Sequence, residues 1–286
     1  MKVGYAGIIT RPECQEVEQI GREVVAWFAE RHIKADLNRI APEMDVLIVL
    51  GGDGTLLHVA SEASEYQLPV LGVNLGHLGF LTEVIANEMY DAFTTLLAED
   101  VRMEKRIMLS AAYVNGTTGE TSRSIHALNE VVIVKKSKEA MIRLRCWADE
   151  EYVTTYRADG LIMATPTGST AYNLSAGGPV VHAELDAVVV TPICPFMLES
   201  RPVLLGSQHK ITTQLLAPAG QVKVIIDGVL KWTITENDYL LVKKATHPLL
   251  IVSSPWKSYF NILRSKLNWG GASVDVPLPE KVCKHC

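Results

Sequence analysis

The stretch that most constrains the fold is residues 46–57, which read V-L-I-V-L-G-G-D-G-T-L-L. Five apolar residues bounded by glycines are too few for a helix and predict a buried strand of a parallel sheet. Gly51, Gly52 and Gly54 permit a sharp turn, and apolar residues recur at helical spacing immediately afterwards, at Leu56, Leu57, Ala60 and Ala63. The stretch therefore predicts a strand, a glycine loop and a helix in succession.

Such a loop favours a phosphate ligand, because its free N–H groups and the positive end of the helix dipole face whatever lies above the strand. Asp53 lies inside the loop, where phosphate would repel a carboxylate. We therefore expect a second task for Asp53, either accepting a proton from a hydroxyl or holding a divalent cation near the phosphates. The alternative is that it only caps the helix. Gly-Gly-Asp-Gly-Thr after an apolar strand resembles a motif shared by NAD kinases, 6-phosphofructokinases and the diacylglycerol and sphingosine kinases, so the loop indicates a kinase without fixing its substrate.

Length and charge restrict the remaining possibilities. A chain of 286 residues favours two domains, and a net charge of −5 gives no electrostatic signature of binding to nucleic acid or to an anionic membrane. No run of about eighteen apolar residues and no signal-peptide pattern is present. The five cysteines are scattered, as in reduced proteins, so we expect a cytoplasmic location. The terminal Cys283-Lys-His-Cys286 is either half of a zinc or redox site or a tail without function, and the second reading is favoured.

The first part of the chain predicts an α/β domain over residues 1–103, with a Rossmann-like parallel sheet that carries the glycine loop. Residues 2–9 predict a first strand, residues 69–74 another, and residues 87–100 a helix. Glycines between 75 and 82 predict a loop at the same edge of the sheet as Asp53. His77 in this loop is either a phosphate contact or plain loop structure, and the second reading is favoured.

The hydrophobic period changes near residue 101. Short alternating segments separated by turn residues then continue, which predicts a mostly antiparallel β-sandwich over residues 104–255. Within it, residues 156–180 combine five small hydroxyl residues with several glycines, which suits the wall of a ligand site better than a core. From Trp256 the helical period returns, so residues 256–286 predict a C-terminal helix and a tail.

Several motifs together resemble those of the NAD kinase family over essentially the whole chain. They are residues 74–80 (N-L-G-H-L-G-F), Asn129-Glu130, Asp159-Gly160, residues 165–172 (T-P-T-G-S-T-A-Y), residues 175–179 (S-A-G-G-P) and residues 191–195 (T-P-I-C-P). The resemblance implies ATP-dependent phosphorylation of the adenosine 2′-hydroxyl of NAD, giving NADP and ADP. It also implies a divalent cation, expected to be Mg²⁺, a homodimer or homotetramer, an NAD-binding role for the β-sandwich, and a C-terminal helix that packs back on the first domain.

The resemblance assigns roles to individual residues. Asp53 would accept the proton, and Gly51, Gly52, Gly54 and Thr55 would hold the ATP phosphates. Asn129 and Glu130 would bind the adenosine part, Asp159 would lie near the nicotinamide end, and Thr167 would lie near the adenine. The remaining substrate contacts implied are Gly54, His58, Asn74, Phe80, Arg157, Thr170, Ala171, Tyr172, Asn173, Leu174 and Ser175. The metal ligands are not assigned.

Two positions depart from the family pattern. Phe196 stands where a histidine is common, and Val229 stands where a glutamine is common, which puts nucleotide fit and the choice of donor in doubt. Asp227-Gly228 before Val229 is also a strong two-residue hairpin signal, so a turn is favoured over a ligand contact there. Asp159-Gly160 is compatible with a plain turn as well. Two other functions stay open: a lipid or sugar kinase that shares only the Asp53 loop, and a non-catalytic NADP(H)-binding sensor.

Overall fold

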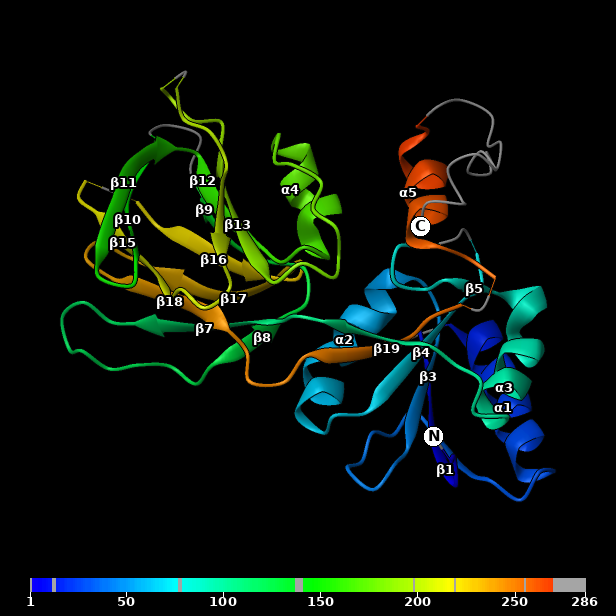
Figure 1. The fold of residues 1–286 in the computed structure, drawn as a ribbon. Helices are drawn as coiled ribbons and strands as arrows, with labels where there is room; N and C mark the ends of the chain where they lie inside the picture. Colours follow the sequence, from blue (N-terminus) through cyan, green and yellow to red (C-terminus); the bar gives the residue numbers. More distant parts are fainter. Residues whose placement is uncertain are drawn as a thin grey trace.

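A computed structural model describes residues 2–11, 14–76, 79–136, 141–197, 199–218, 220–254 and 256–269 (Figure 1). Its strands form three sheets, one in a layered α/β part and two that pack face to face in a β-sandwich. The expected combination of an α/β part and a mostly antiparallel β-sandwich is confirmed. No helix among the described residues is long and apolar enough to cross a membrane.

The first sheet has the order β2-β1-β3-β4-β19-β6, with β5 pairing beside the end of β4. The strands in that order are β2 (Lys34–Leu37), β1 (Tyr5–Thr10), β3 (Val46–Leu50), β4 (Pro69–Asn74), β19 (Leu249–Val252), β6 (Met103–Arg106) and β5 (Val84–Ile85). Every pairing is parallel except that of β6 with β19. The glycine loop follows β3 in the middle of this sheet, as expected.

Helices cover both faces of this sheet, and the alternation along β3 shows why. Val46, Ile48 and Leu50 point to the face covered by α1 (Gln15–Ala29) and α3 (Met89–Leu97), which follows the short 3-10 helix η1 (Ala86–Glu88). Leu47 and Val49 point to the opposite face, covered by α2 (Asp53–Glu65). A strand buried on both faces reads as a continuous apolar run, which is the pattern of residues 46–50.

The β-sandwich consists of two six-stranded antiparallel sheets. One has the order β11 (Glu151–Ala158), β10 (Ile142–Ala148), β15 (Ile211–Leu216), β18 (Tyr239–Lys244), β7 (Leu109–Val114) and β8 (Ile125–Ala127). The other has the order β14 (Val203–Gly206), β13 (Ala187–Ile193), β12 (Gly160–Ala164), β9 (Glu130–Lys135), β16 (Val222–Ile226) and β17 (Val229–Ile234). The core lies between them, and β10 illustrates the pattern, with Leu144 and Cys146 buried and the intervening Arg145 exposed.

Three short helical segments complete the fold. The 3-10 helix η2 (Gly168–Thr170) and α4 (Tyr172–Ser175) follow β12, and α5 (Tyr259–Leu267) follows β19. Figure 1 shows α4 and α5 on the same side of the molecule, α4 beside β13 and α5 above β4 and β5. The α5 segment is tied to the first sheet, because Lys257 Nζ donates to the Glu83 carbonyl and to Glu88 Oε2, both at 2.8 Å or less.

Two strands that the sequence assigned to the β-sandwich belong to the first sheet instead. β6 and β19 fall within residues 104–255 almost entirely, yet both belong to the first sheet. β6 is short and polar, and β19 is an apolar tetrapeptide that looks like any sandwich strand, so neither carries a signal of its partner. Residues 270–286, with Gly270 and both terminal cysteines, and His77 lie outside the described residues.

Candidate active site

The turn from β3 into α2 leaves its backbone open to a ligand. Gly51 must be glycine because a Cβ there would overlap the side chain of Thr55, which is itself buried. At Gly52 and Gly54 a Cβ would meet no atom within 4 Å, so the backbone faces open space at both positions. α2 begins at Asp53, immediately after Gly52. The first turn of α2 therefore presents free N–H groups and the positive end of its dipole to the cavity described next.

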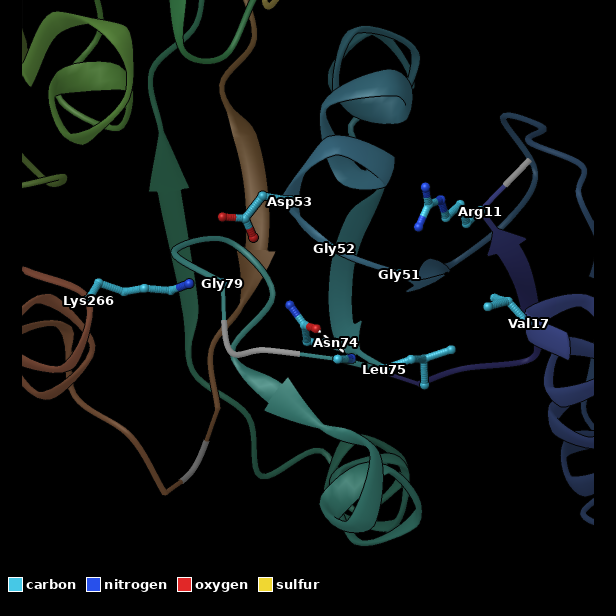
Figure 2. A pocket seen from close by; sticks show the side chains of 10 residues that line it. Arg11, Val17, Gly51, Gly52, Asp53, Asn74, Leu75, Gly79 and Lys266 are labelled. Carbon is cyan, nitrogen blue, oxygen red and sulfur yellow. Dashed lines mark hydrogen bonds between the residues drawn. The ribbon is translucent and has the colours of Figure 1, made fainter. Parts of the chain in front are cut away.

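A cavity of about 430 Å³ lies at this turn, at the carboxyl ends of the parallel strands. Gly51, Gly52, Asp53 and Asn74, four of the residues with expected roles, line it together with two cations, Arg11 and Lys266. Figure 2 shows Arg11, which follows β1, and Lys266, from α5, on opposite sides of the glycine loop. The cavity thus joins a helix N-terminus to two positive side chains, which suits a phosphate chain.

The carboxylate of Asp53 is held by the loop that follows β4. Its Oδ2 accepts the N–H of Phe80 at 2.8 Å, while its Oδ1 accepts the N–H groups of Leu81 and Thr82, both at 3.1 Å. Thr82 Oγ1 donates to the same Oδ1 at 2.9 Å. No side chain caps α2, so the cap alternative does not describe Asp53. The carboxylate instead fixes the loop around Phe80 against the start of α2.

A second carboxylate holds the Asn129-Glu130 segment in the same way. Asp227 accepts the N–H groups of Leu128 at 2.7 Å, Asn129 at 2.9 Å and Glu130 at 3.0 Å. Asp227 and Gly228 have φ values of 44° and 79°, the left-handed values of a tight two-residue hairpin. The predicted turn is therefore present, and its side chain has a further task, because it positions the segment to which the family resemblance gives the adenosine contacts.

Glu130 is a buried carboxyl group with an unusual titration. Burial, and then the nearby charge of Asp227, raise the pKa of Glu130 to about 8, and the backbone N–H of Tyr172 offsets this only in part. Glu130 is 7% exposed, and its Oε2 has no hydrogen-bond partner. A buried polar atom without a partner is costly in a folded protein, so this oxygen is a candidate contact for a ligand hydroxyl.

The hydroxyl-rich segment after β12, residues 165–175, has a buried side and an open side. On the buried side, Asn173 is 0% exposed, and its amide donates to the carbonyls of Ser169 and Pro179 and accepts from Thr191 Oγ1 at 2.7 Å. Thr167 is also buried, and its Oγ1 has no partner. The open side consists of the half-buried Thr170, Ala171 and Leu174 and the exposed Tyr172 and Ser175. Asn173 therefore holds the segment in place, while its neighbours face outwards.

A second cavity, of about 420 Å³, lies on the other side of the first turn of α2. Gly54 and His58 line it from α2, and Asp227, Gly228 and Val229 line it from the β16–β17 hairpin. The two cavities thus flank Asp53 and Gly54. The departure at Val229 lies in the wall of this second cavity, where its side chain is 40% exposed.

Apolar packing brings the two parts of the site together. Leu56, one turn after Asp53, lies in one buried cluster with Leu81 and Leu128. The N–H of Leu81 binds Asp53 and the N–H of Leu128 binds Asp227, so both carboxylate-held segments are anchored in the same cluster. Glu130 and Tyr172 then continue the contact to the hydroxyl-rich segment. Asp53 and that segment therefore belong to one region, although different sheets carry them.

Comparison with known proteins gives this arrangement a family. The ATP-NAD kinase N-terminal domain model matches residues 11–101, and the ATP-NAD kinase C-terminal domain model matches residues 128–254. The NAD kinase of Geotalea daltonii is 39% identical over 285 residues, covering 94% of this chain and 99% of that protein. That of Solibacter usitatus is 37% identical over 281 residues, covering 93% and 97%. The chain belongs to the NAD kinase family.

Solved structures show the same fold. Yeast NADH kinase, crystallised with NADH, superposes with a TM-score of 0.87 at 23% identity and covers 96% of this chain and 90% of its own. An NAD kinase from Archaeoglobus fulgidus, in complex with ATP, superposes with a TM-score of 0.74 at 22% identity, covering 92% and 98%. The fold expected from the NAD kinase resemblance is therefore confirmed.

Asp159 and Arg157, both of which have expected substrate contacts, lie away from the region of Asp53. Asp159 precedes β12 and Thr165 follows it, so about 20 Å of extended strand separates them. Asp159 forms an ion pair with Lys135 at 2.6 Å. The guanidinium of Arg157 lies 4.9 Å from the ring centre of Phe196, the other departure from the NAD kinase pattern. This group is at the opposite end of the strand from the hydroxyl-rich segment of the same chain.

Four residues of this candidate site were missed or underrated from sequence: Arg11, Thr82, Asp227 and Lys266. Arg11 directly follows a parallel strand, and the rule that ligands lie beyond the carboxyl ends of such strands points to it. Asp227 was read chiefly as a turn. Lys266 reaches the cavity only because α5 folds back, which no local pattern reveals. Among the described residues, no group of three or more His, Cys, Asp or Glu side chains has the arrangement of a metal site.

Proposed function

We propose that this protein transfers the γ-phosphoryl group of ATP to the adenosine 2′-hydroxyl of NAD, giving NADP and ADP. The observation that supports this most is Asp53, a carboxylate at a helix N-terminus that lines the first cavity, while its neighbour Gly54 lines the second. The ribose oxygen forms a bond to the γ-phosphorus as the bond from that phosphorus to the β–γ bridging oxygen breaks and ADP leaves. Asp53 accepts the hydroxyl proton, which later passes to solvent.

The first cavity is the proposed donor site. The backbone at Gly51 and Gly52 and the dipole of α2 favour phosphate oxygens, and Arg11 and Lys266 add two charges. A triphosphate carries more negative charge than these two side chains neutralise. A Mg²⁺ ion bound mainly through the phosphates would supply the rest. Asp53, the one carboxylate among the described residues that line this cavity, fits such an ion as a neighbouring oxygen.

The acceptor site is proposed between Glu130 and the open side of residues 167–175. Glu130, with its pKa of about 8, is mostly protonated at pH 7, so it can donate a hydrogen bond to a ribose hydroxyl oxygen. Tyr172 and Ser175 are exposed and would cover the nucleotide. Asn129, Thr167, Thr170, Ala171 and Leu174 complete the proposed contacts.

The nicotinamide end would involve a second copy of the chain. About 20 Å of strand lies between Asp159 and the hydroxyl-rich segment, so a partner subunit would bring its Asp159 and Arg157 to the site more readily than the same subunit does. This supports a homodimer or homotetramer. A cytoplasmic location is also proposed, on the cysteine pattern; the described Cys14, Cys146 and Cys194 are free thiols.

The central test measures ADP release by the purified full chain for each acceptor, and NADP formation separately with an NADP-specific dehydrogenase. NAD should be phosphorylated with ATP and Mg²⁺, whereas diacylglycerol and fructose 6-phosphate should not be. Parallel reactions with inorganic polyphosphate, with NADH and without Mg²⁺ define the donor, the acceptor and the ion. Phosphorylation of a lipid or a sugar instead would overturn the proposal.

Asp53→Asn separates an enzyme from a binding protein. The amide keeps the size of the side chain but cannot accept the proton, so kcat should fall roughly 10²- to 10⁴-fold while the Kd for NAD changes less than about threefold. The matched control is Asp100→Asn, an exposed aspartate after α3. An unchanged kcat in Asp53→Asn would exclude the proton-acceptor role.

A further inference from the structure

Thr82 is a buried hydroxyl that touches the carboxylate of Asp53 and nothing on the surface. Its side chain is 0% exposed, and its Oγ1 lies 2.9 Å from Asp53 Oδ1 and 2.8 Å from Asn74 Nδ2. Asn74 ends β4, and Thr82 closes the loop that follows it. The three side chains thus form a short polar chain beneath the donor cavity.

The direction of this chain is fixed. Asn74 Oδ1 accepts the N–H of Gly76 at 2.9 Å, so the other end of the amide, Nδ2, must be the end that faces Thr82. Nδ2 can only donate, which makes Thr82 Oγ1 the acceptor of that bond. The one hydroxyl proton of Thr82 is then directed to the carboxylate of Asp53.

The donors are distributed unequally over the two carboxylate oxygens. Each oxygen has about two lone-pair positions. Among the residues that the structure describes, Oδ1 receives three donors, from Leu81 N–H, from Thr82 N–H and from Thr82 Oγ1, whereas Oδ2 receives only the N–H of Phe80. Oδ1 is therefore saturated, and Oδ2 is the oxygen with a lone pair left for an incoming proton.

Two glycines provide the space for this arrangement. A Cβ at Gly79 would overlap Asp53 Oδ1 and Thr82 Oγ1, so the loop can close over the carboxylate only with glycine there. A Cβ at Gly72, on β4, would lie 2.9 Å from Thr82 Cγ2, a separation that side chains do not tolerate. The positions of Asp53 and Thr82 are therefore set by the backbone on both sides.

We propose that Thr82 is a positioning residue for phosphoryl transfer. Its hydroxyl group, oriented by the hydrogen bond from Asn74, donates to Oδ1 of Asp53 and leaves Oδ2 as the oxygen that takes the ribose proton. This inference rests on the proposed kinase function. Thr82 acts only through Asp53, and touches neither substrate. Its removal should therefore impair the chemical step rather than the binding of NAD.

The first test compares Thr82→Val, which removes the hydroxyl, with Thr82→Ser, which keeps it. A carboxylate displaced by about 1 Å loses on the order of 10²-fold in rate, so we expect Thr82→Val to lower kcat roughly 10- to 100-fold, with KM for NAD within about threefold of the wild type. Thr82→Ser should retain kcat within about threefold. Equal losses in Val and Ser variants would overturn the proposal.

A double-mutant cycle with Asp53→Asn distinguishes positioning from general loss of structure. If Thr82 acts through Asp53, adding Thr82→Val to Asp53→Asn should lower kcat less than about threefold further; a second full loss would contradict the proposal. Should the valine variant lack a cooperative thermal unfolding transition, Thr82→Ala takes its place in the same cycle. If the wild type phosphorylates NAD and Thr82→Val keeps a kcat near that of the wild type, this inference alone is overturned. If the wild type does not phosphorylate NAD, the proposed function is overturned as well.

Discussion

Replacing Glu130 with glutamine should make the protein less sensitive to alkaline pH. The pKa of this buried carboxyl group is about 8 in the folded protein, against 4.5 for an ordinary glutamate. Between these values the unfolded chain releases the proton and the folded protein keeps it, so the free energy of unfolding of the wild type falls as pH rises. At about 1.36 kcal/mol per pH unit, this loss reaches about 4 kcal/mol between pH 5 and pH 8. Glutamine does not titrate, so Glu130→Gln should lose none of it.

The measurement is urea unfolding of both proteins at pH 5, 6, 7 and 8, followed by circular dichroism. The difference in unfolding free energy between Glu130→Gln and the wild type should increase with pH by about 4 kcal/mol, whatever its value at pH 5. Glu151→Gln, at an exposed glutamate on β11, is the matched control and should follow the wild-type curve. Parallel curves for Glu130→Gln and the wild type would refute the buried, protonated carboxyl group.

Two further predictions concern the donor cavity and the packing beneath the site. Arg11→Ala and Lys266→Ala should each raise KM for ATP about 10-fold or more, because each removes a charge-assisted contact to phosphate. KM for NAD should be unchanged in both. A normal KM for ATP in both variants would place the donor elsewhere. In a thermal unfolding experiment, Leu128→Ala should lower the free energy of unfolding by roughly 2 to 5 kcal/mol, because Leu128 is 0% exposed. The control Leu204→Ala, at a leucine that is 53% exposed, should lower it far less.

Local patterns were sufficient for the start of α2. The apolar run of β3, the glycines and the helical spacing after them all act within a dozen residues, and the structure places strand, loop and helix there. β10 is likewise one of the short alternating segments expected after residue 101, with a buried residue at every second position from Ile142 to Cys146. In both cases the signal and the element are the same segment, which is why the sequence sufficed.

Features that depend on distant segments were not accessible in this way. β19 pairs with β4 although about 180 residues separate them, and its four apolar residues carry no indication of that partner. Lys266 reaches the donor cavity because the segment after β19 returns to the first sheet. Asp227 was recognisable as a turn residue, but its bonds to residues 128–130 depend on how β16 pairs with β9.

The two carboxylates share a structural solution that explains how parts of different sheets can form one site. Asp53 and Asp227 each accept N–H groups from three successive residues, so each fixes a loop without any help from ligand. Leu81 and Leu128, one residue from each loop, meet in the same buried cluster. The relative position of the two loops therefore depends on apolar packing rather than on an ion pair between them, so ionic screening does not weaken it. A site built in this way can admit highly charged nucleotides without their charges competing for the contacts that hold it together.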